Sequence, residues 1–230
     1  MSSGSLGGGP PAGPRLGAVE AALGSDFAAL NPRLQSLYGA TSGWHGSGTF
    51  EVVGAPRLLV RLALRPLGAD RALPGGYGRD VPFTVDVAQQ WNGERVLMRT
   101  ERTYWLGGRR QASVSVTVAE RGPSALGSAG GAGGAADGAW SLTDYLGDAP
   151  RLVTRAIAAV EDGALLLRSS GSLFQVGGRS VAVPGPVGPV ATTMHSFDDR
   201  TQRHRIEVSV RHSWLGELLA YRGWFSAMSA

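Results

Sequence analysis

Apolar and polar residues alternate along much of the chain beyond residue 80, with the two-residue period of a β-strand. The clearest case is 111–120, where Ala112, Val114, Val116 and Val118 alternate with small polar residues, as in an amphipathic strand. Further strands are predicted at 46–53, 81–87, 95–105, 165–176, 190–197 and 204–212. In all, about seven to nine strands are expected.

Turn residues between these segments favour antiparallel hairpins. Asn92-Gly93 is typical of a tight turn between two strands, and 198–201 joins the last predicted pair. The alanine-rich segment 152–160 fits either a helix or a strand, and the turn residues at 161–163 favour a strand.

A helical period is confined to the N-terminal part, where residues 15–38 predict two or three short helices. Between 58 and 67 the apolar run is interrupted by Arg61 and Arg65, whose spacing also fits a short helix, so this segment stays open. Together these patterns predict a mainly β (α+β) fold, with a strongly curved antiparallel sheet or incomplete β-barrel behind short N-terminal helices.

Two segments are poor in residues that could build a core. Residues 1–14 are rich in glycine, serine and proline and predict a disordered leader, and residues 123–138 are a Gly/Ala-rich insertion. The insertion is expected to be flexible, with a lid as the alternative. The remainder, 15–230, is expected to form one β-rich domain.

The segment 211–225 is dense in aromatic residues, glycine and arginine, so we expect it to dock into the core. Trp214, Tyr221, Arg222 and Trp224 fit an aromatic cage. The simpler alternative is that both tryptophans pack in the core while Arg222 anchors a carboxylate.

Composition narrows the function classes. The chain has no cysteine, which excludes disulfides and thiolate chemistry, and its 22 basic residues are all arginine. These arginines are scattered along the chain and the net charge is only +4, which argues against a nucleic-acid-binding protein. No run is long and apolar enough for a membrane span, no secretory leader is recognisable, and a cytoplasmic location is expected. No Gly-rich loop follows a strand and opens a helix, so no nucleotide cofactor is expected.

Acid–base chemistry is the sharpest catalytic hypothesis. If the polar faces of the strands line the concave side, carboxylates beside arginine could act as a base or an electrostatic clamp. The predicted catalytic residues are Asp86, Glu101, Arg205 and Glu207. The predicted ligand-binding residues are Trp91, Arg99, Tyr104 and His195. The alternative is that the charged residues form cross-strand ion pairs on a solvated face.

A metal site is an alternative to the acid–base site. His195 and His204 are expected to lie near each other on paired strands and, with Glu207, could hold an ion. Two histidines at a surface or pocket edge are the favoured interpretation, so neither a metal nor a cofactor is expected.

The two ends of the chain carry a resemblance. Leu30, Pro32, Gly46, Gly48 and, most specifically, Tyr221-Arg222-Gly223-Trp224 are similar to domain-of-unknown-function family 4166, a little-characterised bacterial family. The resemblance spans most of the chain and implies a mainly β domain found alone or C-terminal to saccharopine-dehydrogenase-like reductases. It implies no particular chemistry, and no reductase domain accompanies it here.

Three functions follow as hypotheses. The first is a pocket that cyclises, isomerises or dehydrates a hydrophobic biosynthetic intermediate without a cofactor, for example in secondary metabolism. The second is a non-catalytic carrier of a lipid-like ligand. The third is a structural interaction domain, with an exposed apolar patch near Trp214 or Trp224 at the interface of a homo-oligomer.

Overall fold

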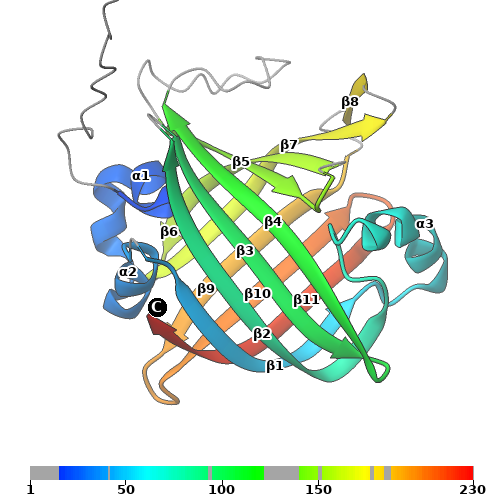
Figure 1. Ribbon diagram of the computed structural model, residues 1–230, viewed down its shortest axis with the longest axis horizontal. Helices are drawn as coiled ribbons and strands as arrows, with labels where there is room; N and C mark the ends of the chain where they lie inside the picture. The colour runs from blue at the N-terminus through cyan, green and yellow to red at the C-terminus, as the bar shows by residue number, and fades with distance from the viewer. Residues whose placement is uncertain are drawn as a thin grey trace, which may run out of the picture.

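Ten antiparallel strands close into a barrel in the computed structural model, which describes residues 16–40, 42–92, 95–121, 140–149, 152–176, 179–183 and 188–229 (Figure 1). The strands are β1 (Trp44–Gly54), β2 (Tyr77–Asn92), β3 (Arg95–Leu106), β4 (Arg109–Arg121), β5 (Trp140–Leu146), β6 (Leu152–Glu161), β7 (Ala164–Val176), β8 (Arg179–Val183), β9 (Val190–Asp198), β10 (Arg203–His212) and β11 (Gly216–Ser229). The expected leader at 1–14 and insertion at 123–138 lie outside the described residues.

Neighbouring strands pair in chain order from β1 to β7, and the ring continues through β9, β10 and β11 back to β1. Strand β8 stands apart from the ring and pairs with the far half of β7. The predicted mainly β fold is therefore confirmed, and its sheet closes more completely than expected. Strands β5 and β8, and the continuation of the C-terminal segment as strand β11, were not predicted.

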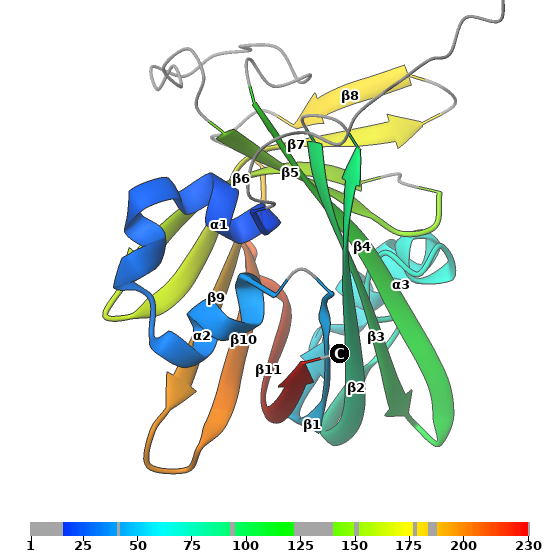
Figure 2. The ribbon, with the colours of Figure 1, turned by 60° about the vertical axis from the view of Figure 1, so that its left-hand side comes forward.

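Helices lie at the two ends of the barrel (Figures 1 and 2). Helix α1 (Ala18–Leu23), the 3-10 turn η1 (Gly24–Ala29) and α2 (Pro32–Tyr38) confirm the predicted short N-terminal helices. At the other end, α3 (Leu58–Ala69) connects β1 to β2 and resolves the open segment 58–67 as a helix. None of the helices in the described parts of the chain has the length and apolar character needed to cross a bilayer.

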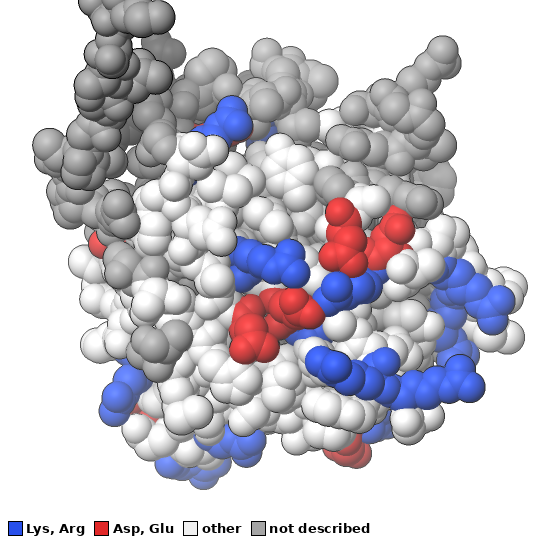
Figure 3. Space-filling view, viewed as in Figure 1, with Lys and Arg blue, Asp and Glu red and all other residues white. Residues whose placement is uncertain are grey.

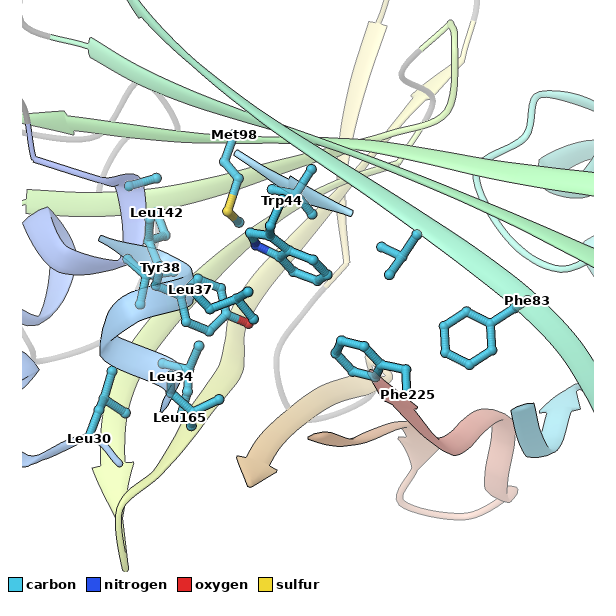
Figure 4. Close-up of a cluster of buried hydrophobic side chains, with 14 of the residues drawn as sticks. Leu30, Leu34, Leu37, Tyr38, Trp44, Phe83, Met98, Leu142, Leu165 and Phe225 are labelled. Atoms are coloured by element: carbon cyan, nitrogen blue, oxygen red, sulfur yellow. The ribbon is translucent and has the colours of Figure 1, made fainter. Parts of the chain in front are cut away.

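The end beneath α1 and α2 is filled with buried side chains. Leu34 and Leu37 of α2 are almost fully buried, as Figure 4 shows beside Leu142 and Leu165. Gln89 of β2 holds the N-terminal segment in place, since its side chain accepts from the Ala18 backbone N–H and donates to the backbone carbonyls of Tyr38, at the end of α2, and Ala40. These contacts stabilise the closed end of the barrel.

The barrel closes where β1 meets β11, and glycines allow the two backbones to approach. A Cβ on Gly48 would lie 2.0 Å from the Trp224 carbonyl oxygen, and one on Gly223 would lie 2.3 Å from the Thr49 carbonyl oxygen. The rings of Phe50 and Phe83 stack close by, with centroids 3.8 Å apart. Glycine at positions 48 and 223 therefore has a steric reason.

We expect Gly48→Ala to lower the free energy of unfolding by about 3 kcal/mol, because a backbone carbonyl has to move to admit the methyl group. Urea unfolding followed by circular dichroism measures the change. Gly171→Ala is the matched control, since Gly171 also lies in a strand but a Cβ there meets no atom within 4 Å. Equal stability of the two variants would contradict the steric explanation.

Candidate functional site

The barrel interior contains a cavity of about 230 Å³. Strands β1, β2, β10 and β11 supply a mainly apolar wall, and Figure 4 shows Trp44, Phe83 and Phe225 directed toward the interior. The rings of Trp44 and Phe225 stack at 5.7 Å between centroids. At the far end, Leu64 and Leu67 of α3 also contribute to the lining.

The opposite wall, from β3 to β6, is polar. Its polar side chains are Thr100, Arg102, Ser113, Ser115, Thr117, Asp144 and Thr154, with Met98, Val114, Leu146 and Leu152 as its apolar members. Tyr38, Ser172, Thr193 and His195 are further polar lining residues. The two sides of the cavity therefore differ in polarity: one wall is apolar, and the opposite wall is rich in hydroxyl and charged groups.

Arg102 is the charged centre of this polar wall. It lies on β3 between Val85 of β2 and Ser113 of β4. Its guanidinium carbon is 5.8 Å from the centroid of the Tyr221 ring on the apolar wall. Among the described residues, no carboxylate lies within ion-pair distance of Arg102. A cation held in a largely apolar cavity without a counter-ion is costly unless something else pairs with it.

Asp144 of β5 is the carboxyl group of the cavity lining. Burial raises its pKa above the ordinary aspartate value, while the hydrogen bond from Thr117 and the positive charge of Arg102 oppose that shift. The Thr117 hydroxyl oxygen is 2.5 Å from the Asp144 carboxylate oxygen. Asp144 is thus a group that can hold or release a proton inside the barrel.

A hydrogen-bonded chain connects α2 with the interior. The Tyr38 hydroxyl is 2.7 Å from Nδ1 of His195, whose Nε2 is 3.2 Å from Nδ1 of His204. Burial, followed by the charges of His204 and Arg102, lowers the pKa of His195 to about 3. Burial and the charge of Arg33 lower that of His204 to about 4. Burial also raises the pKa of Tyr38.

Both imidazoles are therefore neutral at pH 7, so each ring has one donor and one acceptor nitrogen. In one tautomer arrangement the Tyr38 hydroxyl donates to Nδ1 of His195 and Nε2–H of His195 donates to Nδ1 of His204, and in the other both donations run in the opposite direction.

The four predicted catalytic residues are not among those that line the cavity, because their strands turn them to the outer face. Asp86 pairs with His45 at 2.7 Å, and both side chains are largely exposed. Glu101 pairs with Arg71 and Arg99, and Arg205 pairs with Glu207 at 2.5 Å. This is the arrangement of the alternative, in which these charges form ion pairs on the outside of the sheet.

Of the predicted ligand-binding residues, His195 lines the cavity. Arg99 lies outside, paired with Glu101 at 3.1 Å. Trp91 donates its indole N–H to the Leu16 carbonyl and so holds the N-terminal segment. Tyr104 is 1% exposed and packs in the core, and burial raises its pKa to about 12.

The metal alternative needed three ligands together. His195 and His204 do meet, but Glu207 is bonded to Arg205 on the outside of the strand that carries His204. Within the described ranges, no three potential metal-ligating side chains gather.

The C-terminal aromatic residues also take places that differ from the prediction. Trp214 lies in the β10–β11 turn and is 81% exposed, so its predicted packing in the core is wrong. Trp224 is partly buried on the outer face, with the Arg205 guanidinium 4.6 Å from its ring. Arg222 does anchor a carboxylate, that of Glu217.

Arg102 and Asp144 were missed at the sequence level. A signal for Arg102 exists, because Val96, Met98, Tyr104 and Leu106 share its side of β3 and are all buried. A charged residue in an otherwise buried periodic set is unusual and points to the interior. Asp144 has no such signal, since the strand that carries it was not predicted.

Comparison with known proteins places this barrel in a family. The family model described as "Domain of unknown function (DUF4166)" matches residues 30–128 and 134–225. The chain is also similar to the uncharacterized protein YndH of Bacillus subtilis (strain 168), at 23% identity over 206 residues, which cover 85% of this chain and 90% of that protein. Because the family model covers most of its length, the chain belongs to the DUF4166 family.

Proposed function

We propose that the barrel binds an apolar or amphipathic carboxylic acid. The ligand carboxylate pairs with Arg102, and its hydrocarbon part packs against the apolar wall. The observation that carries the proposal is Arg102, a cation in the cavity with no carboxylate partner among the described residues. A ligand carboxylate supplies the missing counter-ion, and a guanidinium can hold it through two parallel hydrogen bonds.

The polar neighbours of Arg102 suit an anionic head group. Ser113 lies directly opposite Arg102 in the β3–β4 pairing, and Thr100 lies two residues along the same strand, so both hydroxyls are within the same part of the wall. Burial raises the pKa of Asp144, and in its protonated form this carboxyl can donate to a ligand oxygen instead of repelling it. The cavity volume, about 230 Å³, is at the small end for ligand pockets and favours a short ligand.

These features favour the carrier function over the catalytic function inferred from the sequence. That catalytic hypothesis relied on Asp86, Glu101, Arg205 and Glu207, which face outward in ion pairs. Binding requires only shape, an apolar wall and one cation, all of which the cavity residues supply.

The test is calorimetric titration of the full chain, stripped of bound lipid, with three ligands of equal chain length: decanoate, decanol and decylamine. We expect decanoate to bind best, decanol to bind more weakly because it lacks the charge, and decylamine not to bind because it places a second cation beside Arg102. Equal affinity for decanoate and decanol, or no binding of either, would remove the basis for the proposal.

A second candidate is cofactor-independent isomerisation or dehydration of the bound acid. Asp144 is the observation that favours it, because a buried carboxyl with a raised pKa beside an anion site can act as a general acid or base. The mass and structure of a ligand recovered after incubation separate the two candidates, since a carrier returns its ligand unchanged.

A further inference from the structure

At the α3 end of the barrel, exposed apolar side chains come together from two separate segments. Leu58, Leu59 and Leu62 of α3 are 61%, 79% and 43% exposed, and Trp214 and Leu215 of the β10–β11 turn are 81% and 52% exposed. We call these five residues the α3 face. They make up more than half of the large exposed hydrophobic side chains in the described parts of the chain.

The two segments are in contact. A guanidinium nitrogen of Arg57, at the N-terminal end of α3, donates to the Leu215 backbone carbonyl at 2.5 Å. Figure 1 shows the end of the β10–β11 hairpin beside α3. The exposed apolar side chains of the two segments therefore gather at the same end of the barrel, and clustered exposed apolar residues are of the kind that marks an interaction site.

Helix α3 has a different apolar side for the barrel. Leu67 is buried, Val60 and Leu64 are partly buried, and Leu64 and Leu67 line the cavity. The side that carries Leu59 and Leu62 points away from these residues. The exposed leucines therefore do not contribute to packing the helix against the barrel. Within the described ranges, no strand packs extensively against the backbone of α3.

The charges around the α3 face are basic. Arg57, Arg61 and Arg65 follow at four-residue intervals along one edge of the helix, and Arg211 precedes the β10–β11 turn. Residues 54–69 and 208–216 contain no aspartate or glutamate; the first acidic residues after them are Asp70, at the C-terminal end of α3, and Glu217, which pairs with Arg222. Figure 3 shows basic side chains at the right-hand edge, where α3 lies in Figure 1, and acidic side chains nearer the middle of the barrel wall.

We propose that the α3 face docks on the surface of an anionic lipid bilayer. The exposed leucines and Trp214 enter the interfacial region, and the flanking arginines contact lipid phosphates. A helix with an apolar face bordered by arginines fits this occupant better than an uncharged protein surface, because the charge of the bilayer complements the arginine edge. Docking there brings the α3 end of the cavity to the source of an amphipathic ligand.

Vesicle co-sedimentation of the full chain tests the docking independently of any ligand in the barrel. We expect binding to vesicles of phosphatidylcholine and phosphatidylglycerol, weakening as salt is added, and little binding to phosphatidylcholine alone. Arg57→Gln with Arg65→Gln should weaken binding about 30-fold. Arg200→Gln with Arg203→Gln is the control, because these exposed arginines lie at the opposite end of β10 and should change binding less than twofold.

Trp214 gives a second readout that a merely structural role does not move. Its emission should shift to the blue when anionic vesicles are added, and Trp214→Phe should remove that shift while vesicle binding persists. Leu59→Asp should abolish binding, with circular dichroism confirming the fold. Equal binding to both vesicle types, no binding, or a dimer in solution that Leu59→Asp dissociates would overturn the proposal, and the last outcome would assign the face to a second copy of the chain. Decanoate affinity in solution does not depend on these outcomes.

Discussion

Arg102→Met is expected to lower the affinity for decanoate by about 100-fold or more, while affinity for decanol stays within a few-fold of the wild type. Truncating one partner of a buried, hydrogen-bonded charge pair costs about 2–5 kcal/mol, and the methionine keeps most of the apolar volume of the arginine stem. Calorimetric titration with both ligands measures the change. Arg102→Lys should give an intermediate loss, because an ammonium keeps the charge without the paired donors.

Arg102→Met is expected to leave the stability of the ligand-free protein unchanged or to raise it, although it weakens ligand binding. Removing an unpaired cation from a largely apolar cavity eliminates a desolvation cost, so the ligand-free variant should unfold at an equal or higher urea concentration than the wild type. Arg99→Met is the matched control: it lies three residues away on the same strand, faces outward and pairs with Glu101. It should leave decanoate binding unchanged. If Arg102→Met bound decanoate as well as the wild type does, Arg102 would not be the carboxylate partner.

Strand β4 shows why the sequence predicted the fold better than the site. Its alternation of valine with serine and threonine identifies an amphipathic strand but does not tell which face is the inner one, and Ser113, Ser115 and Thr117 line the cavity. Val114 is almost fully buried, and its backbone N–H donates to the Arg71 carbonyl in the segment after α3. A two-residue hydrophobic period shows that the two faces of a strand differ in polarity. Which face points into the barrel depends on what covers the other face.

The same reasoning accounts for the predicted catalytic residues. Asp86 and Glu101 were placed inside on the assumption that the polar faces of all strands line one cavity. On β2 the inner set is Phe83, Val85 and Val87, so Asp86 faces out, whereas on β4 the inner set is polar. The walls of this barrel differ in polarity, and no pattern within a single strand reveals that. Strand count, hairpins and short helices were predictable because they depend on local sequence.

Lowering the pH from 7.5 to 5 is expected to reduce the free energy of unfolding by about 3–4 kcal/mol through His195 and His204 alone. In the folded state the two pKa values are lowered to about 3 and about 4, whereas unfolded histidine titrates near pH 6.5. Between these values the unfolded chain binds more protons than the folded one, so stability falls as the pH falls. Each histidine contributes roughly 2 kcal/mol at pH 5.

Asp144 acts in the opposite direction, because a carboxyl with a raised pKa in the folded state gains stability as it is protonated. The measurement is therefore cleanest in an Asp144→Asn background, with urea unfolding at several pH values. His212→Gln, which changes a histidine outside the buried chain, should leave the pH dependence unaltered, while His204→Gln should remove about half of it. Equal stability at pH 7.5 and 5 would show that the Tyr38–His195–His204 chain accepts protons freely. The buried chain would then not be held neutral by its apolar surroundings.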